Sequence, residues 1–540
     1  MAVALAWWVP GSLFFFRAAW RSGFDKMFGD IGDNRLIVLY HEHWLQVLRG
    51  QVSWTSPNYF YPAKGVLGYS DTCVLNEVFY LPLRLARLDP FLALQWTIVL
   101  MSLTGFVSLF FFLRLLTQLS RPVCGALSLV CIFANNLYVS TSHLQLLSLF
   151  WIPPVLLLGL CAWRANTPRA QRALSGGCGL LFGALTYSTF YIAWFAGFAM
   201  VIFVAVVGVL RVRSAGWRHC QAVLRLLWSR AAMFVIGFAL AMIPFVITYL
   251  PALRKSGGRP YSVVMALAQS PRDVVNVGST NYLWGSLVRG QLPASRITNV
   301  ELSTAVTPFV LMLLLSAVFI ALRQRRAGTH VALAEACIAS GITAGVIILL
   351  PIDFGFASLW RVPWAVVPGA SGIRAVGRGV VVAAPIAVIG IAIGIRLIPE
   401  YRHLVASRRW RSAGLCAVLT LAVIEQINLG QNSGIDRSEQ LATLASTPVP
   451  PPECQSFYVI SSTIAPVASF HSEIDAMLLA QRIGLPTVNG YSGLAPDGFG
   501  ALNPDDANYV ALINDWAYRQ HDLPGLCTYA RLDRRWILPG

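Results

Sequence analysis

The sequence predicts an all-α polytopic membrane protein with about eleven transmembrane helices and a small C-terminal α/β domain outside the membrane. Of the 540 residues, 56% are hydrophobic and only 12% are charged, whereas soluble domains carry about 25% charged residues. Apolar runs long enough to cross a bilayer, about 20 residues each, recur along the chain. The net charge of +17 comes from basic residues spread over short connections, where they orient a membrane protein. We therefore exclude nucleic acid as a partner.

The apolar runs divide the chain into membrane spans. Residues 4–20 lack a preceding basic region and a clear cleavage pattern, so we interpret them as a retained first span. The spans are expected at residues 4–20, 92–116, 122–141, 144–163, 174–190, 191–210, 231–250, 304–322, 331–350, 379–398 and 412–428. The pairs within 122–163 and 174–210 are separated only by very short polar breaks.

The connections between these spans fall into two groups by charge. One group contains almost no acid, and the positive-inside rule places it in the cytoplasm. Its arginines are Arg114, Arg121, Arg164, Arg169, Arg172, Arg211, Arg213, Arg218, Arg225, Arg230, Arg323, Arg325, Arg326, Arg396, Arg402, Arg408, Arg409 and Arg411. The other group holds nearly all the Asp and Glu residues and must face outward. It consists of the loops 21–91, 251–303 and 352–378 and the tail.

This segregation predicts a cytoplasmic N-terminus and an extracytoplasmic C-terminus. Residues 1–429 form the membrane core, and residues 430–540 form the outer domain, which is long enough to fold as a small unit. Cys454 and Cys527 lie near the two ends of that domain. Because disulfides persist in oxidising compartments, we expect these two cysteines to be joined.

The most informative motif is the acidic loop that follows the first span, Gly29 to Arg35. Its two carboxylates, Asp30 and Asp33, are unusual in so apolar a chain, because a carboxylate in hydrocarbon costs about 3 kcal/mol. Carboxylates serve as general bases or as metal ligands. Asp33 also stands where a helix N-cap would be expected. The helix that follows is predicted to lie on the membrane interface.

Polar residues elsewhere on the outer side are further candidates for binding substrate. Asp71 either binds an acceptor or a metal, or stabilises a turn. Arg374 and Arg378, at positions i and i+4, are expected on or near one helical face just outside the tenth span. That placement suits a lipid phosphate, and interfacial anchoring explains it about as well. His143 and Gln145 either line a cavity or form interhelical hydrogen bonds.

Glu425 is an acid inside a span and is therefore a site candidate by default. No P-loop, dinucleotide-binding glycine pattern or paired CxxC motif occurs. His41-Glu42-His43 lacks the HExxH zinc spacing, so we expect these side chains to be polar groups on a wet helix face.

Several motifs together resemble those of the type C (GT-C) membrane glycosyltransferases, which use polyprenyl-phosphate sugars. They are Gly29-Asp30, Asn58-Tyr59-Phe60-Tyr61-Pro62, Ser70-Asp71 and His143-Leu144-Gln145-Leu146-Leu147. The chain is most similar to uncharacterised bacterial members of this superfamily, and the similarity is densest over residues 1–165.

The resemblance implies a GT-C-like fold and an inverting sugar transfer in which a first-loop acid is the general base. We assign that role to Asp30 first and to Asp33 second, with the same pair as ligands of a divalent metal ion. The implied partners are a polyprenyl-phosphate-linked sugar, a periplasmic glycan, lipid or protein acceptor, and the lipid bilayer. The implied location is the bacterial inner membrane, with the C-terminus in the periplasm.

Two other function classes stay open at this point. A flippase or transporter of lipid-linked saccharide also needs arginines around a lipid-open cavity, although the spans show no inverted repeat. The second alternative is a non-catalytic protein that binds a glycolipid.

Overall fold

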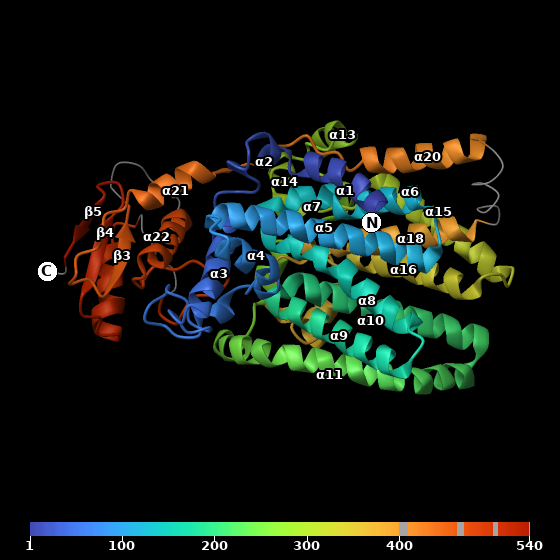
Figure 1. The fold of residues 1–540 in the computed structure, drawn as a ribbon, viewed down its shortest axis with the longest axis horizontal. Helices are drawn as coiled ribbons and strands as arrows, with labels where there is room; N and C mark the ends of the chain where they lie inside the picture. The colour runs from blue at the N-terminus through green and yellow to red at the C-terminus, as the bar shows by residue number, and fades with distance from the viewer. Residues whose placement is uncertain (399–408, 432, 462–468, 500–505, 539–540) are drawn as a thin grey trace.

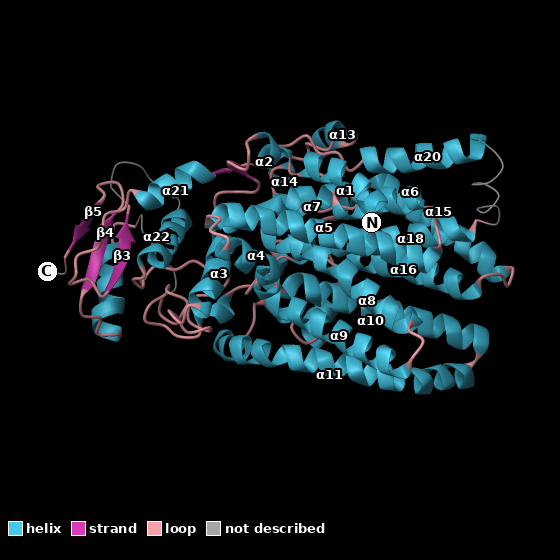
Figure 2. Cartoon of the chain, viewed as in Figure 1, coloured by secondary structure: helices cyan, strands magenta, loops and turns pink. Residues whose placement is uncertain are grey.

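A bundle of long helices forms most of the molecule, and a smaller domain with a β-sheet lies at one end of the bundle in the computed structural model (Figure 1). The structure describes residues 1–398, 409–431, 433–461, 469–499 and 506–538. The predicted cytoplasmic residues Arg402 and Arg408 lie outside this range. Helices dominate the bundle, and most strands lie in the terminal domain (Figure 2).

Among the residues that the structure describes, eight helical segments are long and apolar enough to cross a membrane. They are Pro90–Thr117 (α5), Arg121–Ser142, Leu144–Arg164, Phe190–Ala215 (α10), Arg225–Lys255 within α11 (Trp217–Ser256), Pro308–Arg326 (α15), Val331–Leu349 (α16) and Val376–Leu397. The other three predicted spans correspond to helices that are shorter or less apolar. These are Ala2–Phe15 (α1), Pro168–Ser188 (α9) and Ala413–Ile424 within Arg409–Ile424 (α20). The count of eleven therefore stays a prediction.

Shorter helices connect these segments on the outer side and within the bundle. They are Arg17–Arg21 (α2), Asp33–Leu48 (α3), Glu77–Leu85 (α4), Tyr261–Met265 (α12), Gly285–Gln291 (α13), Ala294–Ile297 (α14) and Arg361–Val366 (α17). The segment 121–164 is built from α6 (Arg121–Ile132), α7 (Asn135–Val139), two 3-10 helices (Ser140–Ser142 and Leu144–Trp151) and α8 (Ile152–Arg164). The segment 376–397 consists of a 3-10 helix (Val376–Val382) and α18 (Ala383–Leu397).

Local sequence explains where the long helices begin. Asp89 accepts a hydrogen bond from the Leu92 backbone N–H at 3.1 Å, and Pro90 occupies the first turn of α5. Thr167 caps α9 in the same way, and Pro168 follows it. A capping side chain satisfies an amide that has no partner within the helix, and proline fits there because its missing N–H is not needed.

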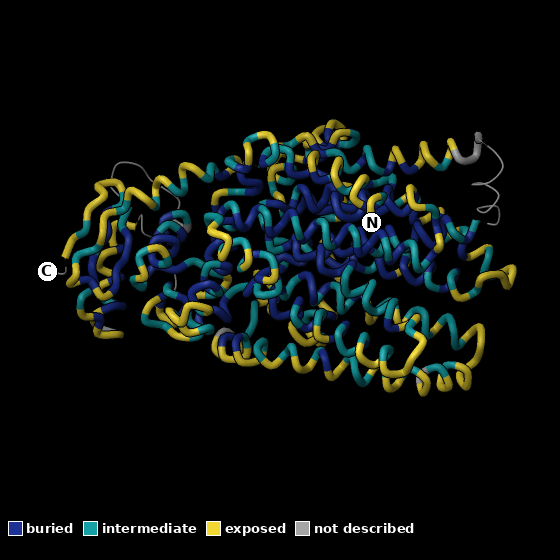
Figure 3. Tube along the Cα trace, in the orientation of Figure 1, coloured by how far each residue is buried: buried dark blue, intermediate teal, exposed yellow. Residues whose placement is uncertain are grey.

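Helices α9 and α11 approach each other closely because glycines face the contact. A Cβ atom placed on Gly179 would lie 2.0 Å from the Phe234 carbonyl oxygen, and one on Gly237 would lie 2.1 Å from the Gly176 carbonyl oxygen. Small residues allow this approach between membrane helices. Away from this contact, α11 exposes large apolar residues such as Leu240 and Ile243, which suits contact with lipid, and exposed positions recur along the helix (Figure 3).

The two ends of the bundle differ. At the end farthest from the terminal domain lie the connections between α8 and α9, α10 and α11, and α15 and α16 (Figure 1). Predicted cytoplasmic arginines such as Arg164, Arg213 and Arg326 lie in the helix ends beside these connections. At the opposite end, α3 lies against the terminal domain (Figure 1). The arrangement separates the acidic and basic groups of connections in space.

The terminal domain combines helices with a three-stranded sheet. Strand β3 (Ser456–Ile460) is parallel to β4 (Leu526–Ala530), and β4 is antiparallel to β5 (Arg535–Ile537). The helices are Arg437–Ala445 (α21), Ser469–Ile483 (α22) and Tyr509–Asn514 (α23), which continues as a π-helical turn over Asp515–Gln520. Two short strands, Lys26–Met27 (β1) and Ile435–Asp436 (β2), pair the first outer loop with the start of this domain.

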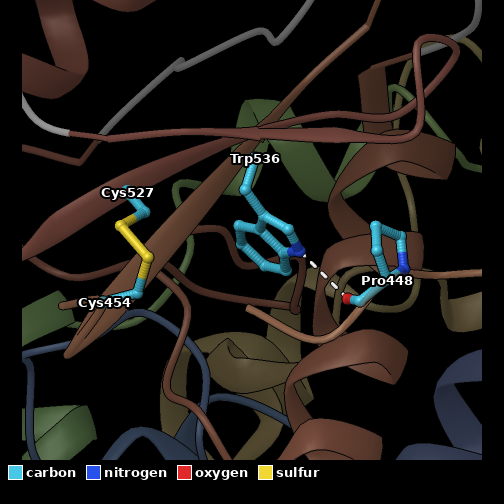
Figure 4. Close-up of a disulfide and its surroundings, with 4 residues drawn as sticks. All are labelled: Pro448, Cys454, Cys527 and Trp536. Atoms are coloured by element: carbon cyan, nitrogen blue, oxygen red, sulfur yellow. Dashed lines mark hydrogen bonds between the residues drawn. A yellow bond between two sulfur atoms is a disulfide. The ribbon is translucent and has the colours of Figure 1, made fainter. Parts of the chain in front are cut away.

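A disulfide joins the two cysteines that the sequence analysis paired. The Cys454 and Cys527 sulfurs are 2.00 Å apart, with the Cα atoms 5.5 Å apart (Figure 4). Nearby, the Trp536 indole N–H donates to the Pro448 carbonyl oxygen at 3.0 Å. The disulfide therefore joins the segment before β3 to β4, and strand pairing joins β3 itself to β4.

Candidate functional site

The acidic loop is clamped in place by its neighbours. Gly29 has φ +102°, and a Cβ atom there would overlap the Asn34 side chain, so only glycine fits this position. The buried Asn34 amide donates to the Thr141 carbonyl oxygen at 3.0 Å and accepts from the Leu144 N–H at 3.3 Å. The Gly434 N–H, from the terminal domain, donates to the Gly29 carbonyl oxygen at 2.8 Å.

These contacts bring Asp33 and His143 together, although they are far apart in sequence. The His143 Nδ1 lies 2.8 Å from the Asp33 Oδ2. On the other side of the ring, the His143 Nε2 lies 3.2 Å from the Glu301 Oε1 and 3.1 Å from the Arg378 Nη2. Arg378 also donates through Nε to both oxygens of Glu301, at 3.0 and 2.8 Å. Three predicted outer loops and the short break between two predicted spans thus meet in one network.

The charges in this network support each other. Burial lowers the pKa of His143, but its hydrogen bonds with Asp33 and Glu301 outweigh burial and raise that pKa above its usual value. Burial raises the pKa of Glu301, yet the hydrogen bonds from Arg378 and His143 hold it well below its usual range. The two carboxylates therefore favour the protonated form of His143, and the charge of Arg378 opposes it.

Asp30 lies beside this network rather than inside it. Its Oδ1 accepts from the Gly32 N–H at 2.8 Å. Burial and the neighbouring Asp33 carboxylate raise the pKa of Asp30, although hydrogen bonds and His143 oppose the shift. A carboxylate with a raised pKa is a stronger base than an ordinary Asp. Asp33 is not the helix cap, because α3 has Gly32 at its N-cap position and Asp33 in its first turn.

Asp71 is connected to the same region through the start of α10. Its Oδ1 accepts from the Phe190 N–H at 3.1 Å. Burial raises the pKa of Asp71 to about 6, and the Phe190 hydrogen bond and the charge of Arg378 moderate the shift. Arg378 also lies over the Tyr191 ring, with its guanidinium carbon 5.8 Å from the ring centroid.

The two arginines of the third outer loop differ in environment. Arg374 precedes the 3-10 helix Val376–Val382 and is exposed, whereas Arg378 lies within that helix. The sequence-based picture of both residues on one helical face is therefore wrong, because the backbone before Val376 is not helical. The Tyr191 hydroxyl accepts from the Arg374 backbone N–H at 2.7 Å, which fixes the loop.

The terminal domain contributes to the site as well. The Arg259 Nη2 donates to the Gly493 carbonyl oxygen at 2.6 Å. Burial and the charge of Asp33 raise the pKa of Tyr491. The charge of Asp30 also raises this pKa, whereas the charges of Arg374 and Arg378 lower it. The segment 487–490 is held to the first outer loop, since the Phe60 N–H donates to the Asn489 carbonyl oxygen at 2.9 Å.

Two predicted site residues have surroundings that differ from this cluster. The Gln145 Oε1 is buried without a hydrogen-bond partner among the described residues. Glu425 is fully buried and accepts from the Phe309 and Val310 N–H groups at 2.6 and 3.1 Å, at the start of α15. The Trp284 indole donates to the same carboxylate at 2.6 Å.

The sequence predicted that the histidines of α3 lie on a wet helix face, and this prediction is wrong. His41 and His43 are both buried, and burial lowers their pKa values to about 3 and about 4. Nor does α3 have one apolar and one polar side, since its buried residues include both apolar and polar positions. Residues of the first outer loop and α4 cover the histidines, and α22 of the terminal domain also packs against the helix.

Sequence reasoning missed Glu301, Arg259, Tyr191 and Tyr491. Only Glu301 carried a usable signal, since it is one of two acids in the second outer loop. Within the described part of the chain, no three His, Cys, Asp or Glu residues are grouped as a metal site.

Comparison with known proteins identifies the fold. The apo form of the Archaeoglobus fulgidus oligosaccharyltransferase is 10% identical, with a TM-score of 0.52, and the match covers 97% of this chain and 68% of that chain. The chain adopts the GT-C fold. No family model and no curated protein matches the sequence.

Two further structures are similar at lower scores. The same archaeal enzyme in complex with Zn and sulfate is 12% identical, with a TM-score of 0.49, and the match covers 91% of this chain and 62% of that chain. The arabinofuranosyltransferase AftD from mycobacteria is 13% identical, with a TM-score of 0.44, and the match covers 92% of this chain and 32% of that one. This chain thus spans about two thirds of the archaeal enzyme's length and about a third of AftD's.

Proposed function

We propose that this protein is a membrane glycosyltransferase of the GT-C type that transfers a sugar from a polyprenyl-phosphate donor to an acceptor on the extracytoplasmic side. The supporting observation is the network of Asp33, His143, Glu301 and Arg378, with Asp30 beside it in the same acidic loop. Bases and cations gathered at one end of a membrane bundle suit a reaction between an anionic lipid donor and a hydroxyl nucleophile.

In the proposed reaction Asp30 is the general base. It takes the proton of the acceptor hydroxyl, and the hydroxyl oxygen forms a bond to the anomeric carbon of the donor sugar. The bond from that carbon to the phosphate oxygen breaks, polyprenyl phosphate leaves with the bonding electrons, and the anomeric configuration inverts. The raised pKa of Asp30 favours this role over Asp33, whose carboxylate is engaged by His143.

We assign different roles to Arg374 and Arg378. Arg374 is exposed and is the group we assign to the donor phosphate, because guanidinium binds phosphate oxygens through paired hydrogen bonds. Arg378 is already paired with Glu301, so we assign it to holding His143 and Asp33 in position. Asp71 and Gln145 stay candidates for binding the acceptor.

A divalent metal ion is a further part of the proposal. Asp30 and Asp33 stand three residues apart in the acidic loop, and the charge of Asp33 contributes to the raised pKa of Asp30. Mg²⁺ is commonly held by one or two carboxylates together with substrate phosphates. Asp30 and Asp33 would hold such an ion, which would neutralise phosphate charge.

The test is product formation by the purified protein with a panel of polyprenyl-phosphate sugars. We expect Asp30→Asn to lower kcat by about 100-fold or more while donor binding is retained, because the change removes basicity and keeps the side-chain size. Glu301→Gln should weaken transfer less, by releasing Arg378. The matched control is Asp533→Asn, at an exposed carboxylate of the terminal domain.

Two results would count against the proposal. Wild-type protein that moves lipid-linked saccharide across a vesicle membrane without forming a glycosidic bond is a transporter. Wild-type transfer that both Asp30→Asn and Asp33→Asn leave unchanged would show that the first outer loop is not the catalytic centre.

A further inference from the structure

A cavity of about 280 Å³ opens at the surface of the terminal domain, between α21, α22 and the end of β4, and its lining residues Thr443 and Ser446 are exposed. Its wall from α21 and the following turn presents the side chains of Gln440, Thr443 and Thr447. The facing wall from α22 presents Leu478 and Leu479. None of these residues belongs to the cluster around Asp30 and His143, so the cavity is a separate site.

The size and lining of this cavity fit one sugar ring. Its volume equals the share of roughly nine waters in the liquid, at about 30 Å³ each, and lies at the lower limit of the pockets that hold small molecules, about 300 Å³. A sugar ring has hydroxyl groups around its edge and C–H groups on its faces. Hydroxyl and amide groups on one wall and aliphatic groups on the other complement that division.

Charged residues at the cavity join it to the acidic loop. Asp475 lines the cavity and forms ion pairs with Arg531, which also lines it, and with Arg35 of α3. The Arg35 Nη1 also lies 3.4 Å from the Gln440 Oε1, and its Nε donates to the Ile31 carbonyl oxygen. Ile31 stands between Asp30 and Asp33 in the chain. A ligand in the cavity therefore contacts groups that hold the catalytic loop.

We propose that this cavity is a second carbohydrate-binding site that holds one sugar unit of the acceptor glycan, apart from the unit that reacts. The assignment to a glycan rests on the proposed function. Asp475, Arg531 and Arg534 line the cavity and offer charge-assisted hydrogen bonds to the hydroxyl groups of a polyol. Binding there would anchor the acceptor and order the loop that carries Asp30.

The direct test is ligand-observed NMR on the full-length protein in detergent, with glucose, glucuronic acid, inorganic phosphate and acetate as probes. We expect at least one of the two sugars to bind with a millimolar Kd, and Thr443→Trp, which fills the cavity, to weaken that binding at least tenfold. Ala442→Trp is the matched control, because Ala442 is the exposed neighbour on α21 and does not line the cavity. Ser446→Trp, also at the lining, replaces Thr443→Trp should that variant fail to fold.

The outcomes separate this inference from the proposed function. Asp30→Asn should bind the sugar as the wild type does, even though it does not transfer. Sugar binding without sugar transfer in any assay would support the carbohydrate site and contradict the proposed glycosyltransferase activity. Absence of sugar binding, binding of phosphate and acetate alone, or equal sugar binding by Thr443→Trp and Ala442→Trp would overturn the inference.

Discussion

His143 shows how one residue acquires its role from distant neighbours. Its position at a break between two apolar runs made it a candidate for lining a cavity, with interhelical hydrogen bonding as the alternative. In the structure it is held between Asp33 and Glu301, which come from different outer loops. No spacing in the sequence relates these two acids, because their proximity depends on how the helices that carry the loops pack.

Asp71 carries a prediction about pH. Burial raises its pKa from about 4 to about 6, so the folded protein binds this proton more tightly than the unfolded chain. Stability linked to Asp71 is therefore fully present below about pH 4 and is lost as the pH rises through about 6, by at most about 3 kcal/mol.

Asp71→Asn removes this titration and keeps an oxygen that accepts from the Phe190 N–H. We expect the variant to match the wild type near pH 4 and to unfold at a higher temperature than the wild type at pH 7. Thermal unfolding in detergent at several pH values measures the difference. A difference between the two proteins that does not vary with pH would contradict the assignment.

At the scale of elements, α15 depends on an acid from another helix. The Thr307 side chain makes no capping hydrogen bond, and Glu425 accepts the N–H groups of Phe309 and Val310 instead. A carboxylate at a helix N-terminus satisfies unpaired amides and interacts favourably with the helix dipole. This contact explains why an acid is buried at Glu425 without assigning it a substrate-binding role.

The resulting prediction distinguishes a structural Glu425 from a substrate-binding one. Glu425→Gln removes the charge, and we expect a loss of about 1–2 kcal/mol, seen as a melting temperature a few degrees lower. The activity of the protein that remains folded should stay within about twofold of wild type. Unchanged melting together with lost activity would restore the substrate-binding role.

Helix α3 shows the limit of reading one element alone. Its periodicity predicted a helix, and a helix forms over Asp33–Leu48. The same pattern suggested one apolar and one wet side, yet His41, His43 and Gln46 are buried. The first outer loop and α4 cover His41 and His43, and the terminal domain bonds to Gln46. These covering residues lie outside the sequence window of the helix, so its periodicity does not reveal them.

At the scale of the whole molecule, the segregation of charge predicts the membrane orientation. The arginine-rich connections lie at one end of the bundle and the acidic loops with the terminal domain at the other (Figure 1). We expect reporter fusions after Arg172, Arg230 and Arg326 to report the cytoplasm, and fusions after Gly290 and at the C-terminus to report the periplasm.

A fusion within the first outer loop provides the control for that experiment. A cytoplasmic signal from this loop would put Asp30 and Asp33 on the wrong side for an extracytoplasmic acceptor and would remove the proposed function. A cytoplasmic signal from the C-terminus alone would mean that the predicted number of eleven spans is wrong by one. The first outer loop would still lie on the extracytoplasmic side.

The sequence by itself determined the membrane class, the positions of the long apolar helices, the sidedness expected from arginines, and Asp30 and Asp33 as the acids to consider. These properties follow from composition and local periodicity, which each segment carries within itself. Only the tertiary structure decided that Asp33 meets His143, that Arg378 pairs with Glu301, and that Glu425 caps α15. Such contacts join side chains across different loops and helices, and packing of the bundle against the terminal domain sets their distances.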